Sequence, residues 1–453
     1  MHNMPVCARV TDQGGNQMSV TRRRLLGGAA TVSAASILGV NLRPAFAVTP
    51  GKPFDGQEIN VLSVQASQFA AHERHSKTFT ELTGIKVNYI YVPFVALRER
   101  LTAEMVGGSA DFDIVTAMDV WIPPLTDSYL QPIDDLVSAR GIDMADYPEP
   151  FMNAARFPGG IYGLPVRCHV QLLWYRKDLF EKAGLQPPET WEEVGTSGKA
   201  IQDQNSDVAG ITIPYGQKDG QNLMVWYNFL WGAGGDLLDK DLKPVFASEA
   251  GYRATDDFTS YILKDRIVPA GAASFNEADS TTNFFQGKAA MLPVWWHVYN
   301  RLALPDTQVK REQVGFKVLP HYEGKGATTY TNAWIYGINK ATKNRDAAME
   351  FMQYICGADV EREILLNPNE HDVVCVHWQN LRDPEVNARF DGMHAIAAKA
   401  LETTTNSIPN IPQFLGIVDV LSAAVSEVAT GAKEIKPALD EAQQQAERIM
   451  RRG

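Results

Sequence analysis

The sequence has few cysteines for its length, four in 453 residues. Cys168, Cys356 and Cys375 lie beyond the first fifty residues, and three cysteines are too few for a disulfide framework. At most one bridge can form among them. Cys356 and Cys375 would pair in an oxidising compartment, and two free buried thiols are the alternative. The sequence leaves both alternatives open.

An excess of positive charge is also lacking. The chain has 42 Lys and Arg against 53 Asp and Glu, which gives a net charge of −11. Proteins that bind nucleic acids or anionic membranes present a basic patch, so the sequence argues against both kinds of partner. A solvated acidic surface is enough to explain the balance, which therefore does not identify a cationic ligand.

Catalytic motifs are missing as well. The chain contains no P-loop, no Gly-x-Ser-x-Gly, no His-Glu-x-x-His and no dinucleotide-binding fingerprint. Its acidic residues are abundant, but no pair stands out as the acid and nucleophile of a glycosidase. We therefore expect no catalytic residues, no cofactor and no enzymatic activity.

A metal site would rest on two groups of histidines. His72 and His75 are three residues apart in an expected helix, and His371, Cys375 and His377 lie close together in the sequence. Such spacings occur in metal sites, but histidines on helix surfaces are the simpler interpretation. We therefore expect no metal.

Long apolar runs are absent too. The most apolar stretch near the N-terminus, residues 25–40, is shorter than the roughly 20 residues that cross a bilayer. It follows Arg22–Arg24 and precedes Ala45–Ala47, in the order of a signal peptide: basic region, apolar region, small-residue cleavage site. We expect residues 1–47 to be removed near Ala47 and the mature chain to be periplasmic.

The segment Thr21–Leu26 (TRRRLL) resembles the twin-arginine export signal, in which two adjacent arginines are recognised. Ordinary Sec export is the alternative. Met18 stands close before the arginines, so it competes with Met1 as the first residue made.

The remainder of the chain alternates short apolar runs with helix-length amphipathic stretches, which is typical of an α/β protein. The first expected elements are strand 59–64, helix 69–82, strand 85–87, helix 93–106 and strand 113–118. Gly84 stands where a helix commonly ends. These strand–helix units predict a mostly parallel sheet, and the length suits two lobes.

Three later stretches are also regular. We expect a strand over residues 172–175, a helix over 178–183 and a final amphipathic helix over 432–450. Thr190 and Glu193 have the spacing of a capping box, in which each side chain satisfies a free backbone amide at the start of a helix.

Four segments are similar, in the same order, to segments of the family 1 extracellular solute-binding proteins of carbohydrate ABC transporters, the group that includes maltose-binding protein. They are Phe79–Val87 (FTELTGIKV), the stretch Tyr162–Trp191, Phe284–Met291 (FFQGKAAM) and Ile408–Gln413 (IPNIPQ). The similarity extends over nearly the whole mature chain. Arg176 departs from it, because the family usually has Asn or Asp there.

The resemblance implies a type II periplasmic binding protein fold: two hinged α/β lobes with the ligand cleft between them. It places residues 48–166 and about 334–385 in the first lobe, and 167–333 and about 386–453 in the second. The implied function is to bind a sugar or sugar alcohol as a monomer and deliver it to permease subunits in the inner membrane. A carrier of a metal ion, polyamine or sugar acid, and a ligand sensor for a membrane receptor, are the alternatives.

Sugar sites combine flat aromatic faces with polar side chains. Trp295 and Trp296 follow an apolar run, at the place where the resembled family has a stacking aromatic; core packing of both is the alternative. Asp119 and Trp121 follow strand 113–118, and ligands of open α/β sheets bind at the carboxyl ends of strands. Asp119 as an ordinary helix cap is the alternative.

By the resemblance, Arg167 and His169 lie on the first crossing between the lobes, and Asn332 and Trp334 on the second. A guanidinium can grip paired hydroxyl groups or a carboxylate, and an ion pair between the lobes is the alternative for Arg167. Many relatives have two glycines where Asn332 and Trp334 stand. The bulky Trp334 should narrow the pocket, which favours a monosaccharide or polyol.

Five further candidates complete the ligand site. Gln65, Ser67 and Gln68 follow the first strand, in a loop that the family commonly uses, although Ser67 would also serve as a helix cap. Tyr215 and Trp226 belong to the segment of the second lobe that the resemblance turns toward the cleft.

Overall fold

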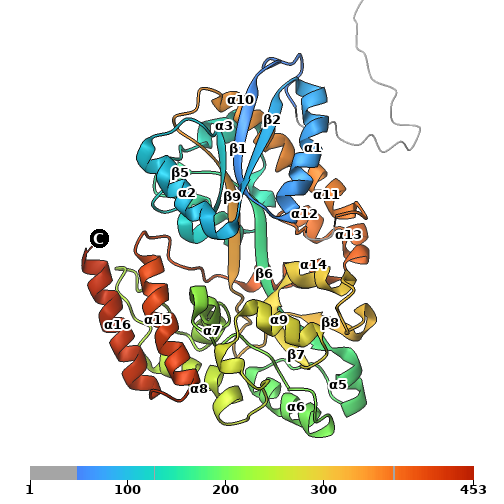
Figure 1. Cartoon of the computed structure of the whole chain (residues 1–453), viewed down its shortest axis with the longest axis vertical. Helices are drawn as coiled ribbons and strands as arrows, with labels where there is room; N and C mark the ends of the chain where they lie inside the picture. The colour runs from blue at the N-terminus through green and yellow to red at the C-terminus, as the bar shows by residue number, and fades with distance from the viewer. Residues whose placement is uncertain (1–47, 127, 371–372, 453) are drawn as a thin grey trace, which may run out of the picture. The chain divides into compact units, whose positions relative to one another are not determined.

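The strands and helices alternate along the chain as expected for an α/β protein (Figure 1). The computed structural model describes residues 48–126, 128–370 and 373–452; residues 1–47, the expected leader, lie outside them. The strands are β1 (Glu58–Val64), β2 (Lys86–Val92), β3 (Ile114–Met118), β4 (Arg156–Phe157), β5 (Gly160–Ile161), β6 (Leu164–Arg176), β7 (Met291–Trp295), β8 (Val314–Lys317) and β9 (Thr331–Ile338).

The helices surround these strands. They are α1 (Ser67–Thr83), α2 (Phe94–Gly107), α3 (Asp134–Arg140), α4 (Glu149–Met152), α5 (Lys177–Ala183), α6 (Trp191–Gln204), α7 (Gln221–Gly232), α8 (Glu249–Leu263), α9 (Glu277–Phe285), α10 (Arg345–Ile355), α11 (Ala358–Leu366), α12 (Trp378–Leu381), α13 (Pro384–Arg389), α14 (Met393–Thr403), α15 (Phe414–Ala429) and α16 (Ile435–Arg452).

The first strand–helix units agree with the sequence predictions. β1 pairs in parallel with both β2 and β3. Gly84 ends α1 with φ +79°, and its N–H donates to the Thr80 carbonyl oxygen; a side chain on Gly84 would also clash with Asp55. Only glycine adopts this conformation at little cost. The Thr190–Glu193 capping box at the start of α6 is confirmed.

The expectation of a mostly parallel sheet is wrong beyond β3. The main sheet has the strand order β2-β1-β3-β9-β6-β7, with β8 also on β6, and every pairing that involves β9 or β6 is antiparallel. β6 is thirteen residues long, whereas a strand was expected only over 172–175. β6 and β9 run in opposite directions between two groups of elements (Figure 1). Local strand–helix patterns do not reveal such a pairing, because the two strands are far apart in the sequence.

The two groups of elements are called the first and second lobes. β1, β2, β3, α1, α2 and α10 belong to the first; β7, β8, α5 to α9 and α14 to α16 belong to the second (Figure 1). β6 pairs with β9 through Val170 and with β7 from Gln171 onward. In the second lobe α7, α8, α15 and α16 pack on one another.

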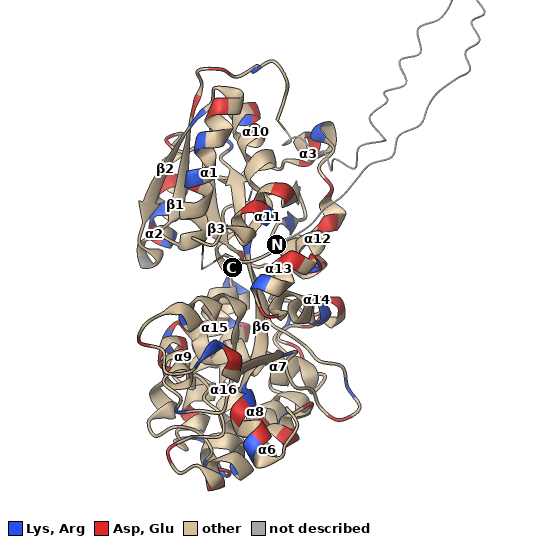
Figure 2. Ribbon diagram, turned by 90° about the vertical axis from the view of Figure 1, so that its right-hand side faces the viewer, with Lys and Arg blue, Asp and Glu red and all other residues tan. Residues whose placement is uncertain are grey.

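Figure 2 shows Lys and Arg interspersed with Asp and Glu along the helices of both lobes. No helix among residues 48–126, 128–370 and 373–452 has both the length and the apolar character needed to cross a membrane. Cys168, Cys356 and Cys375 are buried free thiols. The structure therefore favours the free-thiol alternative for Cys356 and Cys375.

Candidate functional site

The two crossing strands, β6 and β9, bring four of the sequence candidates together. Their register places Arg167 opposite Trp334 and His169 opposite Asn332. Directly opposed residues of antiparallel strands project to the same face, and successive residues to opposite faces. Arg167, His169, Asn332 and Trp334 therefore share one face of the β6–β9 pair, which we call the polar face.

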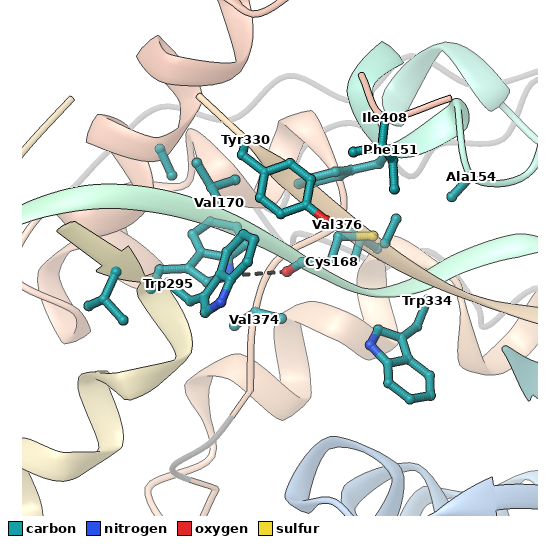
Figure 3. Close-up of a cluster of buried hydrophobic side chains, with 14 of the residues drawn as sticks. Phe151, Ala154, Cys168, Val170, Trp295, Tyr330, Trp334, Val374, Val376 and Ile408 are labelled. Carbon is teal, nitrogen blue, oxygen red and sulfur yellow. Dashed lines mark hydrogen bonds between the residues drawn. The ribbon is translucent and has the colours of Figure 1, made fainter. Parts of the chain in front are cut away.

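The neighbouring strand β7 adds one of the two adjacent tryptophans to this face. Trp295 lies opposite Gln171 of β6, which is two residues beyond His169 and so projects to the same side. Trp296 is fully buried, and its Nε1–H donates to the Cys168 carbonyl oxygen at 3.0 Å (Figure 3). Trp295 is thus the candidate platform, and Trp296 belongs to the core.

Arg167 and His169 form a contact pair on the polar face, in which only Arg167 is charged. Arg167 Nη1 lies 2.6 Å from His169 Nε2. A guanidinium only donates, so Nε2 accepts and the ring of His169 is neutral. Burial lowers the pKa of His169 well below its usual value, and Arg167 and His297 lower it further. The rings of His169 and His297 are 4.8 Å apart, and burial lowers the pKa of His297 to about 3.

Trp295 is held from two sides. Its Nε1–H donates to Glu277 Oε2 at 3.0 Å, and its ring centre lies 5.2 Å from that of Tyr330. Figure 3 draws both side chains next to β6. Burial raises the pKa of the Glu277 carboxyl to about 7, although the hydrogen bond from Trp295 and the charge of Arg167 both lower it.

An amide pair connects α7 to the polar face. Asn228 Nδ2 donates to Gln171 Oε1 at 2.8 Å, and the backbone N–H of Tyr330 donates to Asn228 Oδ1 at 2.6 Å. Tyr330 also packs on Tyr227 of α7, with ring centres 5.2 Å apart. One continuous set of contacts therefore joins Gln171 in the middle of β6, Trp295 at the end of β7 and Tyr330, which directly precedes β9.

Asp119 joins the end of β3 to β9. Its Oδ1 accepts from Val120 N–H at 2.8 Å and from Asn332 Nδ2 at 2.7 Å, and its Oδ2 accepts from Ala333 N–H at 3.2 Å. Burial raises the pKa of Asp119 to about 7, against the effect of these hydrogen bonds. Its observed partners are protein donors, one of them in the short 3₁₀ helix that Asp119 begins.

An aromatic group continues the polar face in the first lobe. The rings of Trp121 and Trp334 are 5.5 Å apart, and Phe94 lies 5.3 Å from Trp121 and 6.1 Å from Trp334. Phe94 is 49% exposed, Trp121 8% and Trp334 3%. The sequence candidates Trp121 and Trp334 thus contact each other, and both contact Phe94, whose ring is partly exposed to solvent.

Two sequence candidates lie in the core of the second lobe instead. Tyr215 and Trp226 are fully buried. The Tyr215 hydroxyl donates to the Phe258 carbonyl oxygen, and Trp226 Nε1–H donates to Thr255 Oγ1, each at 2.9 Å. Their polar atoms are used within the core, so we leave both out of the proposed site.

The three candidates after β1 differ among themselves. Gln65 and Ser67 are exposed and Gln68 is buried. Gln68 Oε1 accepts from Val374 N–H at 3.0 Å, so this side chain connects α1 to a distant segment. Ser67 is the first residue of α1, which has no side-chain cap; the interpretation of Ser67 as a helix cap is wrong.

Sequence reasoning missed Phe94, His297, Glu277, Tyr330 and Asn228. Phe94 opens the helix after β2, at the same carboxyl edge that suggested Asp119, and this position was a usable signal. His297 is two residues beyond Trp295, in the 3₁₀ helix Trp296–Ala303 that follows β7, so strand alternation gave no signal for it. Glu277 and Asn228 belong to helices, and no local pattern relates them to β7 or β6.

Histidines do not form a metal site in the part of the chain that the structure describes, where no three His, Cys, Asp or Glu side chains gather as metal ligands would. His72 is buried, and its Nδ1 lies 3.1 Å from the Tyr336 hydroxyl. Burial lowers the pKa of His72 to about 3. His371, part of the second histidine group, lies outside the described residues.

Comparison with known proteins identifies the family. The model of the bacterial extracellular solute-binding proteins matches residues 63–361. A probable amino-acid ABC transporter periplasmic-binding protein of Sinorhizobium fredii is 25% identical over 438 residues, 93% of this chain and 97% of that protein. The mannitol-binding protein of Pseudomonas aeruginosa is 22% identical over 416 residues, 87% of this chain and 94% of that protein.

A solved structure supports the same assignment. The ABC transporter solute-binding protein of Agrobacterium radiobacter in complex with ribitol is 26% identical, with a TM-score of 0.74, over 88% of this chain and 100% of that chain. The fold is thus the two-lobed fold expected from the sequence. The chain belongs to the bacterial extracellular solute-binding protein family.

Proposed function

We propose that this protein is the periplasmic substrate-binding component of an ABC importer, and that it binds a monosaccharide or polyol and delivers it to the permease subunits as a monomer. The observation that carries the proposal is the polar face of β6 and β9, which unites Arg167, His169 and Asn332 with the indoles of Trp295 and Trp334. Hydroxyl groups need donors and acceptors, and carbon faces need flat apolar surfaces.

Relatives support this class of ligand. The related protein of Pseudomonas aeruginosa is named for mannitol, and the related structure from Agrobacterium radiobacter contains ribitol. Trp334, with Phe94 and Trp121 beside it, would narrow a ligand cleft at this place and leave little room for a long oligosaccharide. A small solute is therefore favoured.

An amino acid is the second candidate, because the relative of Sinorhizobium fredii carries that name. The observation that favours it is the presence of both charges, Arg167 for a carboxylate and Glu277 for an ammonium group. However, Glu277 accepts the Trp295 indole N–H, and the oxygens of Asp119 accept three protein N–H groups. These carboxyl oxygens already accept hydrogen bonds from the protein. They suit the hydroxyl groups of a polyol better than an ammonium group, which needs a free negative charge.

Binding would shift an equilibrium between open and closed lobes. Trp295 and Trp334 are only 5% and 3% exposed, so ligand entry requires the surrounding groups to move apart. Ligand contacts with both lobes would stabilise the closed form by their differential affinity, and about 5.5 kcal/mol moves a mostly open population to a mostly closed one. We propose lobes of residues 48–166 with about 334–385 and 167–333 with about 386–453.

The test is a thermal-shift screen of the purified protein with sugars, polyols, sugar acids, amino acids, polyamines and divalent metals. A ligand that binds only the folded state raises the melting temperature, and we expect selective rises with polyols or monosaccharides. Stabilisation by amino acids, polyamines or metals alone would refute the proposal. Small-angle scattering should then show compaction with the ligand, and the ligand should be recovered chemically unchanged, as expected of a protein that is not an enzyme.

Export has its own test. We propose that the twin-arginine pathway carries the protein to the periplasm and that the leader is cleaved near Ala47. Replacement of Arg22 and Arg23 together by lysine should leave the precursor in the cytoplasm, because recognition depends on the paired guanidinium groups. Continued export of this variant would instead indicate the Sec pathway.

A further inference from the structure

We propose that Glu277 sets the charge selectivity of the site: it makes the site favour uncharged polyhydroxy solutes over the corresponding sugar acids, and it does so while it positions the Trp295 indole. The inference rests on the proposed function. It concerns a residue that the sequence did not indicate, in the first turn of α9.

The placement of Glu277 is well defined. Its backbone N–H donates to Gln221 Oε1 at 2.8 Å, which fixes the start of α9 against α7. Its Oε2 accepts the Trp295 Nε1–H at 3.0 Å. The carboxylate therefore restrains the rotation of the indole about its side-chain bonds, while Tyr330 packs against the same ring.

The same carboxylate belongs to the electrostatic environment of the polar face. The charge of Arg167 acts on Glu277, on His169 and on His297. The two histidines are neutral because burial and Arg167 disfavour their protonated forms. Loss of the Glu277 charge therefore makes this cluster one unit more positive, whatever else Arg167 contacts.

The consequence for ligands follows from like-charge repulsion in a desolvated site. A solute carboxylate that lies against the Trp295 face comes close to Glu277, and two carboxylates at such distances in a partly buried site repel strongly. A hydroxyl group instead donates to a carboxylate. The site therefore accepts a polyol and rejects its aldonic acid, although Arg167 alone would attract the acid.

The selectivity should depend on pH. Arg167 of β6 is the charged group that acts on Glu277, and it also acts on His169 of β6 and on His297 after β7. Burial raises the pKa of Glu277 to about 7, so the carboxyl is charged at pH 8 and mostly protonated at pH 5.5. The pKa values of both histidines are too low for them to titrate in this interval. Asp119, whose pKa is also near 7, changes in the same direction.

The experiment is calorimetric titration of the full-length exported protein with ribitol, mannitol, ribonate and mannonate at pH 8 and pH 5.5. The variants are Glu277→Gln, Glu277→Ala and the control Glu249→Gln. Glu249 is likewise the first residue of a helix, α8, and it is exposed, so the control removes the same charge from an equivalent helical position.

We expect the wild type to bind one polyol at least tenfold more tightly than its aldonate at pH 8, and to lose most of this preference at pH 5.5. Glu277→Gln keeps an acceptor for Trp295 but removes the charge. It should weaken the polyol about threefold and strengthen the aldonate about tenfold. Glu277→Ala should weaken the polyol at least tenfold, because the indole loses its partner. Glu249→Gln should match the wild type.

Three results would overturn the inference: the same polyol-to-aldonate ratio in Glu277→Gln as in the wild type, a wild type that prefers the aldonate at pH 8, or equal polyol affinity in Glu277→Ala and the wild type. These differ from failure of the proposed function, in which the wild type binds neither polyols nor sugars at either pH. Melting curves of each variant establish that it is folded, and the tryptophan emission maximum should shift in Glu277→Ala and return toward the wild type in Glu277→Gln.

Discussion

The two faces of the β6–β9 pair carry different kinds of side chain, although they alternate along the same two strands. Arg167, His169 and Asn332 project to one face. Cys168 and Ala333, their direct neighbours, project to the other and are buried. Because the side-chain period of a strand is two, a step of one residue exchanges the polar face, which we propose binds the ligand, for an apolar core.

The adjacent tryptophans show what distinguishes the faces. Trp296 is fully buried, and its N–H is satisfied by the backbone carbonyl oxygen of Cys168. Trp295 donates to the carboxyl of Glu277, whose pKa burial raises to about 7. A backbone carbonyl oxygen does not titrate, so it accepts the same hydrogen bond at every pH. The ionisation of a carboxyl group, in contrast, changes with pH and with the approach of a charged ligand. The difference predicts separable effects of substitution.

The largest effect should follow substitution of the fully buried tryptophan, Trp296. Trp296→Ala removes a fully buried indole and leaves a cavity between Cys168 and His394, and such truncations cost about 3–5 kcal/mol of unfolding free energy. Chemical denaturation with matched slopes measures the loss. Trp296→Phe, which keeps most of the ring volume, should lose less. A loss below about 1 kcal/mol for Trp296→Ala would mean that Trp296 is not part of the core.

The next effect should appear in ligand affinity rather than in stability. Trp295→Ala removes the candidate platform, and truncation of a central aromatic contact costs about 2–4 kcal/mol of binding free energy. Calorimetric titration with the best polyol measures it. Trp295→Ala should also be more stable than Trp296→Ala in the same denaturant series. Unchanged affinity would mean that the ligand does not bind against Trp295 on the polar face.

The sequence predicted the first strand–helix units well because their signals are local. The apolar run of β1, the helical spacing of α1 and the glycine at position 84 lie within thirty residues, and each was observed. The antiparallel part of the sheet was not predictable in this way. β9 pairs with β6 across more than 150 residues, and no local pattern records that pairing.

The part of the candidate site that lies near strand ends could be predicted from the sequence. Asp119 and Trp121 were expected at the carboxyl end of a strand, and Arg167 and His169 on the first crossing between the lobes. The structure brings these chain segments together. The choice between Trp295 and Trp296 needed the register of β7 on β6, which only the structure gives. Tyr215 and Trp226 were placed by analogy with relatives, and their side chains are in the core.

A smaller effect is expected where the polar face meets the aromatic group of the first lobe. Trp334→Ala should enlarge the pocket beside Trp121 and Phe94 and weaken the native polyol by about 1–2 kcal/mol, because part of the apolar contact is lost. It should also allow a disaccharide to bind that the wild type rejects. Calorimetric titration with both solutes measures the change, and Phe94→Ala serves as the comparison at the exposed edge of the group. An unchanged polyol affinity would show that Trp334 is only a hinge residue.

The smallest effect should belong to the thiol on the buried face. Burial raises the pKa of Cys168, and it also raises those of Cys356 and Cys375. Because the thiolate is the reactive form and reagents need access, a thiol reagent should label none of these three cysteines in the native protein within minutes, and all three after unfolding in denaturant. Saturating ligand should leave this native result unchanged, since the closure that we propose acts on the polar face. Trp296→Ala supplies the positive control, because its cavity should make Cys168 react. Peptide mass spectrometry locates the labelled cysteines. Rapid labelling of Cys168 in the native wild type would show that the face opposite the polar face is also accessible, and the two faces would then not differ as we describe.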